Sequence, residues 1–373
     1  MSDKVDIDPE KLIQEAMNDN KKVLKLSDKF LAKFPESILH FDGLQELDLS
    51  NNSIVAIPGW IANLSELRIL QLSSNQIIKL PESIGQLKNL HKLSLVHNHL
   101  VSLSESIGLL EYLDEIHLFN NRLISIPKAF GNLIKLTGLD LDCNKLTELP
   151  ESIGDLTQLR ELYLLDNFIN YLPQSIGQLT NLRKLDLIIN RLTTIPDSVS
   201  KLHNLENIFL GGNNLLSLPD WIGDLQQLLE IEISHNLLST FPSVILKLKK
   251  LQELNLSKNY LTEIPESISQ LGDLKILNLA SNQLTRLPES IGQLTQLEEL
   301  DLSNNKITKL PERFYQLKKL KKLNLIGNNI KNLPKSFKNL TQLNKLEIFS
   351  NPLRYNYEAS QLPQLIISKD RRM

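Results

Sequence analysis

The sequence predicts an α/β fold: a solenoid of stacked coils with a parallel β-sheet along one side. Asparagine recurs every 23 residues, without insertion or deletion, from Asn52 to Asn351. A leucine eight residues before each asparagine keeps the same step from Leu44 to Leu343. Hydrophobic residues make up 41% of the chain and aromatic residues only 5%, so the core must consist of many aliphatic side chains. One such coil cannot bury its own leucines, and the fold therefore requires neighbouring coils.

Each coil begins with a Leu-x-x-Leu-x-Leu segment, which alternates as expected for a short strand with one buried face. The asparagine follows where the chain turns inward. Its amide is expected to donate to and accept from backbone groups that are otherwise buried without partners. Stacking the coils aligns these amides into a structural ladder: Asn52, Asn75, Asn98, Asn121, Asn144, Asn167, Asn190, Asn213, Asn236, Asn259, Asn282, Asn305, Asn328 and Asn351.

A proline six residues after the asparagine ends the strand geometry of each coil. It recurs from Pro58 to Pro334, with Ser104 as the single exception. Proline fixes an extended or turn backbone. The isoleucine and leucine that follow, such as Ile84 and Leu87, are expected to pack back under the strand.

Both ends of the repeat array suggest caps. Residues 21–353 form about fifteen coils, the first of them degenerate because Lys29 replaces the asparagine. Within residues 1–20, an aspartate followed by Pro9 and an apolar stripe at helical spacing predict a capping helix over residues 9–18. After the last asparagine the repeat dissolves, and residues 354–373 are expected to be a C-terminal cap or tail that covers the last strand edge.

The form Leu-Pro-Glu-Ser-Ile-Gly-Gln-Leu at 80–87 and 287–294 resembles the leucine-rich repeat family, and the resemblance covers roughly residues 21–353. It looks like the 23-residue type found in bacterial proteins and in intracellular signalling scaffolds. The resemblance implies a right-handed, curved superhelix. Its concave side would carry the parallel sheet, and its convex side would be irregular, 3-10 or short helical structure.

Composition restricts the classes of partner and compartment. The formal net charge of −2 gives no global reason to expect nucleic acid or an anionic membrane as a partner. Cys143 is the single cysteine, so an intrachain disulfide framework is excluded. The start of the chain lacks a secretory signal, and no run of 18 apolar residues follows. A cytoplasmic protein without membrane insertion is therefore expected, with secretion as the alternative. A monomer or weak dimer is expected.

The sequence contains no P-loop, no dinucleotide fingerprint and no HExxH zinc motif. The segments outside the repeats are too short to hold a catalytic domain. We therefore expect neither enzymatic activity nor a cofactor, and function is sought in the variable positions of the repeat.

The seventh residue of most coils is serine or another small residue, but in the middle coils it becomes large. Together with neighbouring outward positions, these coils are predicted to form an apolar and aromatic patch on the concave face that binds another protein. The predicted partner-binding residues are Val96, His97, Phe119, Asp142, Tyr163, Leu165, Phe168, Ile188, Ile189 and Phe209.

Two further clusters carry weaker hypotheses. His97 and His117 are expected to face the concave side near Asp142, which suggests a metal site, although the spacing matches no established metal motif. Residues 306–345 carry eleven Lys or Arg and one Glu, which suggests either an anion-binding flank or a solvated face.

The sequence thus favours a non-enzymatic protein-interaction scaffold. The alternatives are a secreted or surface bacterial effector that binds a host protein, and a metal- or ligand-binding protein that uses the concave histidine and aspartate residues.

Overall fold

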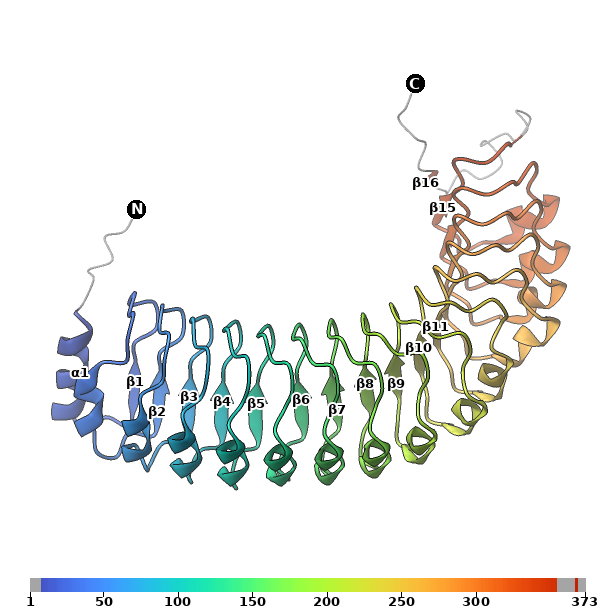
Figure 1. Cartoon of the computed structure of the whole chain (residues 1–373). Coiled ribbons are helices and arrows are strands. Elements are labelled where there is room, and N and C mark those ends of the chain that lie inside the picture. Colours follow the sequence, from blue (N-terminus) through green and yellow to red (C-terminus); the bar gives the residue numbers. More distant parts are fainter. Residues whose placement is uncertain (1–7, 354–365, 368–373) are drawn as a thin grey trace. The chain divides into compact units, whose positions relative to one another are not determined.

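The computed structural model describes residues 8–353 and 366–367. The chain divides into two compact units, residues 1–190 and 191–373. In both units each complete coil contributes one short strand and one 3-10 helix (Figure 1). The 3-10 helices are numbered η1 to η14 in chain order. This is the leucine-rich repeat architecture that the sequence predicts.

The first unit begins with a helix and continues as a stack of coils. Its helix is α1 (Pro9–Asn18). Its strands are β1 (Val23–Lys25), β2 (Glu46–Asp48), β3 (Ile69–Gln71), β4 (Lys92–Ser94), β5 (Glu115–His117), β6 (Gly138–Asp140), β7 (Glu161–Tyr163) and β8 (Lys184–Asp186). Its 3-10 helices are η1 (Glu36–His40), η2 (Gly59–Asn63), η3 (Glu82–Gln86), η4 (Glu105–Leu109), η5 (Lys128–Asn132), η6 (Glu151–Asp155) and η7 (Gln174–Gln178).

The second unit repeats the same plan. Its strands are β9 (Asn207–Phe209), β10 (Glu230–Glu232), β11 (Glu253–Asn255), β12 (Ile276–Asn278), β13 (Glu299–Asp301), β14 (Lys322–Asn324), β15 (Lys345–Glu347) and β16 (Ile366–Ile367). Its 3-10 helices are η8 (Asp197–Lys201), η9 (Asp220–Asp224), η10 (Ser243–Lys247), η11 (Glu266–Gln270), η12 (Glu289–Gln293), η13 (Glu312–Gln316) and η14 (Lys335–Asn339).

Neighbouring strands within each unit are parallel and shifted by one repeat. Leu47 of β2 pairs with Leu24 of β1 and with Leu70 of β3, which places each residue beside its equivalent 23 positions away. The same register joins β10 to β11 and β13 to β14. Equivalent side chains therefore form rows across the strands of each unit, about 4.8 Å apart.

The core of each coil is a set of aliphatic side chains that point between the strand and the 3-10 helix. In the coil of β2 these are Leu44, Leu47, Leu49, Ile54, Ile57, Ile61 and Leu64, which are all buried. Burying each of them stabilises the fold by about 1.5–3 kcal/mol. In this coil Pro58 precedes η2 and is half-buried.

Helix α1 covers the first coil at the amino-terminal end of the first unit (Figure 1). The Asp8 side chain accepts a hydrogen bond from the Glu10 N–H at 3.1 Å, as expected of a helix N-cap. Ile13 and Ala16 are buried, and the helix packs against β1 and η1. The predicted C-terminal cap or tail lies outside the described residues, apart from Ile366–Ile367, which pairs in parallel with β15.

Candidate protein-binding face

The asparagines hold neighbouring coils together. The Asn75 amide nitrogen donates to the carbonyls of Leu49 and Leu72 at 2.9 and 3.1 Å, and its oxygen accepts from the Ile54 N–H at 2.9 Å. All fourteen ladder asparagines accept from the N–H 21 residues earlier. Each amide therefore satisfies backbone groups of two coils.

The residue before each ladder asparagine adopts a left-handed conformation. Asn51, Asn120 and Asn304, for example, have φ of 54–55°. Asparagine and glycine tolerate this region, whereas a β-branched side chain is strained there. Ile189 nevertheless occupies it, with φ 54° and 52% of its surface exposed. In the other coils with a ladder asparagine this position holds Asn, Asp, Ser, His, Lys, Cys or Gly, so Ile189 is its single β-branched residue.

The third, fifth and seventh residues of each coil point away from the core and form what we call the sheet face. Val96, Phe119, Tyr163, Leu165 and Ile188 occupy fifth or seventh positions in the first unit, where they are half-buried. Together with Ile189, we call them the apolar patch. Phe209 occupies a fifth position in the second unit.

Two other predicted residues lie at the border of the sheet face. His97 is at the left-handed turn position after β4. Phe168 follows its ladder asparagine and is 37% exposed, so it lies on the turn rather than on the strand. The prediction treated these positions as part of the strand surface because the sequence pattern does not show where the strand bends away.

Asp142 has a structural role that the sequence does not reveal. In eight coils the fifth side chain accepts from the N–H two residues later, as Asp140 does from Asp142 at 3.0 Å. In the coil of β7 this position is Tyr163, whose hydroxyl donates to Glu161. The Leu165 N–H donates instead to Asp142 Oδ1 of the preceding coil, at 2.6 Å.

The surroundings of Asp142 disfavour its charge. Burial raises the pKa of Asp142 to about 7, and the neighbouring carboxylates Asp140 and Asp186 add to this rise. Burial likewise raises the pKa of Asp186, and it raises the pKa of Tyr163 to about 12 with help from Glu161. Burial is thus the main cause of all three shifts, and the charge of Lys184 opposes it at Asp142 and Asp186.

The histidine cluster does not assemble a metal site among the described residues, where no group of three or more His, Cys, Asp or Glu is suitably placed. His97 Nδ1 lies 2.6 Å from the Asn120 amide nitrogen, and its ring packs edge-on against Phe119. His117 Nε2 lies 3.5 Å from Glu115 Oε2. Each imidazole thus has a different neighbour, and the two do not converge on Asp142.

The basic segment 306–345 is partly neutralised by its own neighbours. Lys321 pairs with Glu298 and Lys322 with Glu299, both at 2.6 Å, and Lys345 lies 3.1 Å from Glu347. These pairs support the hypothesis of a solvated face for this segment over that of an anion-binding flank.

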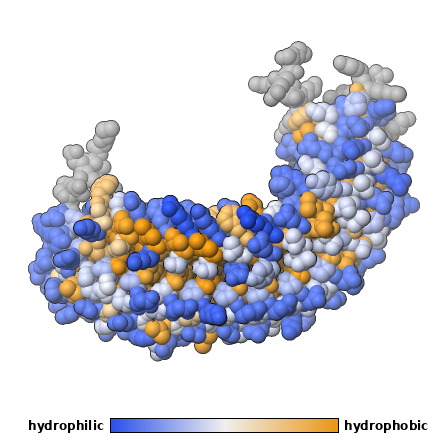
Figure 2. Space-filling view, viewed as in Figure 1, coloured by the Kyte–Doolittle hydropathy of each residue, from blue (hydrophilic) through white to orange (hydrophobic). Residues whose placement is uncertain are grey.

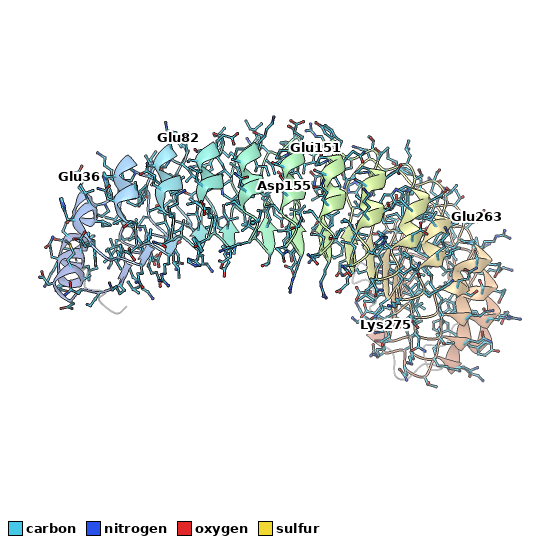
Figure 3. All side chains as sticks on the ribbon, turned by 90° about the horizontal axis from the view of Figure 1, so that it is seen from below. Glu36, Glu82, Glu151, Asp155, Glu263 and Lys275 are labelled. Atoms are coloured by element: carbon cyan, nitrogen blue, oxygen red, sulfur yellow. The ribbon has the colours of Figure 1, made fainter. Side chains whose placement is uncertain are left out.

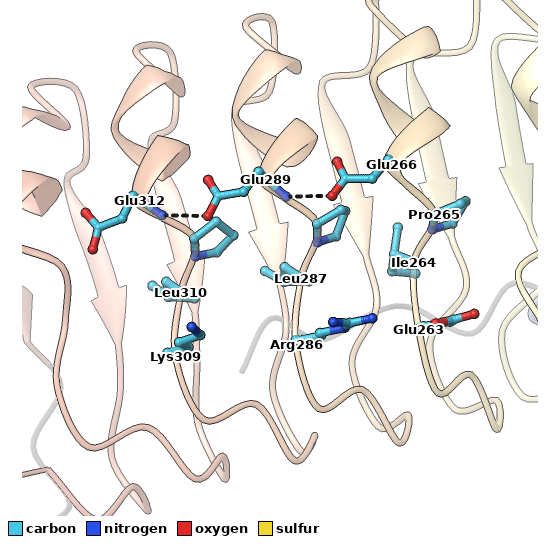
Figure 4. A pocket seen from close by; sticks show the side chains of 12 residues that line it. Glu263, Ile264, Pro265, Glu266, Arg286, Leu287, Glu289, Lys309, Leu310 and Glu312 are labelled. Atoms are coloured by element: carbon cyan, nitrogen blue, oxygen red, sulfur yellow. Dashed lines mark hydrogen bonds between the residues drawn. The ribbon is translucent and has the colours of Figure 1, made fainter.

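A shallow hollow of about 440 Å³ lies on the helix side of the second unit, lined by the same positions of three successive coils (Figure 4). Glu266 accepts from the N–H groups of Glu289 and Ser290, at 3.3 and 3.0 Å. Glu289 accepts from Glu312 and Arg313 in the same way. These carboxylates cap the next 3-10 helix. The same position in the first unit, including Glu82 and Glu151, lies along the helix side (Figure 3).

Two apolar features were missed by sequence reasoning. Val55, Ile78, Val101 and Ile124 occupy one position in four successive coils and are 40–51% exposed. Figure 2 shows hydrophobic residues gathered over these coils of the first unit. This row could have been predicted from the sequence, because later coils mostly have Thr or Ser at the same position. Ile326 and Phe349 also occupy seventh positions, in the second unit.

Family models match most of the chain. A model described as "Leucine-rich repeat region" matches residues 59–164, 142–240 and 267–365. A "Leucine rich repeat" model matches residues 20–77, and another matches residues 250–271. The chain belongs to the leucine-rich repeat proteins.

Solved structures agree with this assignment. A leucine-rich repeat protein of Leptospira interrogans is 36% identical, with a TM-score of 0.88 over 95% of this chain and 98% of that chain. A plant peptide hormone receptor, RGFR1, solved in complex with RGF2, is 31% identical, with a TM-score of 0.74 over 88% of this chain. Drosophila Toll, from the Toll–Spatzle complex, is 25% identical, with a TM-score of 0.76 over 91% of this chain.

This leucine-rich repeat chain spans about half the length of these two proteins, 54% of RGFR1 and 48% of Toll. A comparison with curated proteins finds no match. Among the described residues, no helix has the length and apolar character needed to cross a membrane. The leucine-rich repeat fold is, in general, one that supports protein–protein interaction.

Proposed function

We propose that this chain is a non-enzymatic scaffold that binds a partner protein on the sheet face of its first unit. The observation that carries the proposal is the apolar patch. Val96, Phe119, Leu165 and Ile188 occupy seventh positions that hold serine in coils such as those of β2, β3, β11 and β13. Val96 and Phe119 lie in two adjacent coils, Leu165 and Ile188 lie in two more, and the coil of β6 with Asp142 separates the pairs. Partly exposed apolar side chains gathered in this way, rather than scattered singly, mark binding sites.

The strain at Ile189 supports the same surface. An isoleucine at the left-handed position is about 1–2 kcal/mol less favourable than a residue suited to that region. Ile189 directly follows Ile188 of the apolar patch, which agrees with a role in contact rather than in folding. The peptide hormone receptor RGFR1 and the protein Toll, which share this fold, were solved in complex with RGF2 and Spatzle.

The test is affinity capture from a lysate of the source cells with the full chain and two triple variants. The patch variant carries Phe119→Ser, Leu165→Ser and Ile188→Ser. The control variant carries Leu109→Ser, Tyr112→Ser and Ile134→Ser, which remove residues that are 49%, 49% and 56% exposed but lie off the sheet face.

We expect the wild type and the control variant to retain the same protein, identified by mass spectrometry, and the patch variant to lose it. Circular dichroism confirms that both variants are folded. The proposal would be refuted if the folded patch variant retained every protein that the wild type captures. It would also be refuted if the wild type captured no protein beyond those captured by this variant.

We further propose the cytoplasm as the site of action, because a chain of 373 residues with one cysteine gains nothing from an oxidising compartment. Export as a bacterial effector is the alternative. Immunodetection in culture supernatant, with a cytoplasmic marker confined to the cell lysate, would overturn the cytoplasmic proposal.

A further inference from the structure

The apolar patch is bordered by four carboxylates that form no ion pair with any of the described residues, although the charge of Lys184 lowers the pKa of two of them. Asp140 and Asp142 belong to the coil of β6, Asp166 to that of β7 and Asp186 to β8. Across the described part of the first unit, no ion pair joins any of the four to a lysine or arginine. The Lys92–Glu115 pair at 2.5 Å shows that other carboxylates of the same face are neutralised locally.

The strand register places an aromatic ring between two of these carboxylates. Asp140 pairs with Tyr163, and Tyr163 pairs with Asp186, in adjacent parallel strands. Neighbouring strands are about 4.8 Å apart, so the three side chains form one row on the sheet face. Lys184 Nζ lies 4.9 Å from the centre of the Tyr163 ring and is the resident cation of this region.

Asp186 is the most buried of the four, with 8% of its surface exposed. Its Oδ1 accepts from the Ile188 N–H at 3.0 Å, while within the described chain its Oδ2 has no hydrogen-bonding partner. The charge of Lys184 lowers the pKa of Asp186, but no cation forms an ion pair with it among the described residues. A largely buried carboxylate without such a pair is costly unless a partner compensates it. Burial is the main cause of the raised pKa values of Asp142 and Asp186, and the charge of Lys184 opposes it without cancelling it.

We propose that the partner of this face is a polypeptide segment in which lysine or arginine alternates with apolar side chains, its cations meeting Asp140, Asp142, Asp166 and Asp186 while its apolar residues cover the patch. The inference rests on the proposed function and names the chemistry of the partner. The argument for it is charge complementarity, because the four carboxylates form no ion pair among the described residues and Lys184 acts on Asp142 and Asp186 only through its charge. An acidic or neutral segment would leave these charges desolvated and unpaired, which disfavours binding.

The experiment selects binding peptides from random sequences. A phage library of random 12-residue peptides is panned on the immobilised full chain, and the enriched peptides are synthesised with a fluorescent label. Affinities are then measured by fluorescence anisotropy at low and at physiological salt.

Three variants of the full chain serve as comparisons. The carboxamide variant carries Asp140→Asn, Asp142→Asn, Asp166→Asn and Asp186→Asn, which keeps the acceptors for the backbone N–H groups. The patch variant is the one defined above. The charge control removes four exposed carboxylates off the sheet face through Glu66→Gln, Glu111→Gln, Asp155→Asn and Asp224→Asn.

We expect the enriched peptides to be net positive, with lysine or arginine next to apolar residues. The carboxamide variant should bind them roughly tenfold more weakly, with a reduced salt dependence, while the charge control stays close to the wild type. The inference is overturned if the enriched peptides are neutral or acidic, or if the carboxamide variant binds them with full affinity. In either case the proposed function still stands, provided that the patch variant has lost binding. Both the inference and the proposed function are overturned if the peptides bind the patch variant as tightly as the wild type. They are also overturned if panning on the wild type enriches no peptides beyond those enriched on the patch variant.

Discussion

At the residue scale, the repeat shows which side chains build the fold and which depart from it. Asn144 accepts from the Leu123 N–H and donates to the Leu118 and Leu141 carbonyls, so its identity follows from backbone hydrogen bonding. Ile189 departs from the pattern, because its left-handed turn position suits Asn or Gly. Such departures point to function, since stability alone would have selected against them.

The strain at Ile189 gives a direct prediction. Ile189→Asn places in this coil the residue that occupies the equivalent turn at Asn51 and Asn120. We expect the variant to be about 1 kcal/mol more stable, measured as a higher urea midpoint, because the left-handed conformation no longer strains the backbone. Partner binding should weaken at the same time. As a matched control, Asn120→Ile should lower the midpoint. A less stable Ile189→Asn variant would argue against strain at this position.

Asp142 gives a prediction about pH. Its folded pKa is raised to about 7, whereas an unfolded aspartate titrates near 3.9. Between these values the unfolded chain has lost the proton that the folded chain keeps, so stability falls as pH rises from about 4 to 7. The groups that face the carboxyl are Asp140, Asp186 and Lys184.

Asp142→Asn removes this penalty and retains an acceptor for the Leu165 N–H. We expect equal stability of variant and wild type at pH 4 and a gain of about 1 kcal/mol for the variant at pH 8, after allowing for solvent screening. Urea unfolding at both pH values measures the difference. A gain of the same size at pH 4 would show that the effect is not due to titration.

At the scale of the element, the helix side depends on close backbone approach. A Cβ atom at Gly154 would lie 2.5 Å from the Ser175 carbonyl oxygen, and one at Gly131 would lie 2.4 Å from that of Ser152. Glycine lets successive 3-10 helices stack at this distance. On the strand side, a Cβ at Gly138 meets nothing within 4 Å.

The strands and turns were predictable from the sequence because the residue pattern that determines them repeats in every coil. The Leu-x-Leu alternation gave the strands, the asparagines gave the turns, and Asp8 with Pro9 gave α1, which spans the predicted residues 9–18. Side-chain detail on the sheet face was less predictable. The hydrogen bond from the Leu165 N–H to Asp142 arises because Tyr163 displaces the usual acceptor, and it links residues 23 positions apart. His97 contacts Asn120 of the next coil, whereas His117 lies beside Glu115 of its own strand.

At the scale of the whole molecule, each coil contacts mainly its neighbours in the stack. The stability of such an array is a sum of the intrinsic stability of each repeat and the interfaces between adjacent repeats. A local defect should therefore remain local. The residues 1–190 and 191–373 form two compact units, which makes each unit an internal reference for the other.

Gly154→Ala tests this locality. The added methyl group must push η6 and η7 apart, which we expect to cost about 1–3 kcal/mol because the opposing atoms are backbone. Hydrogen–deuterium exchange followed by mass spectrometry should show faster exchange in peptides from the coils of β6, β7 and β8, and unchanged exchange in those of β12, β13 and β14. Gly138→Ala is the matched control and should leave exchange unchanged throughout, because its methyl group meets open space. Uniformly faster exchange across both units in Gly154→Ala would contradict nearest-neighbour energetics and show that the chain unfolds as one cooperative body.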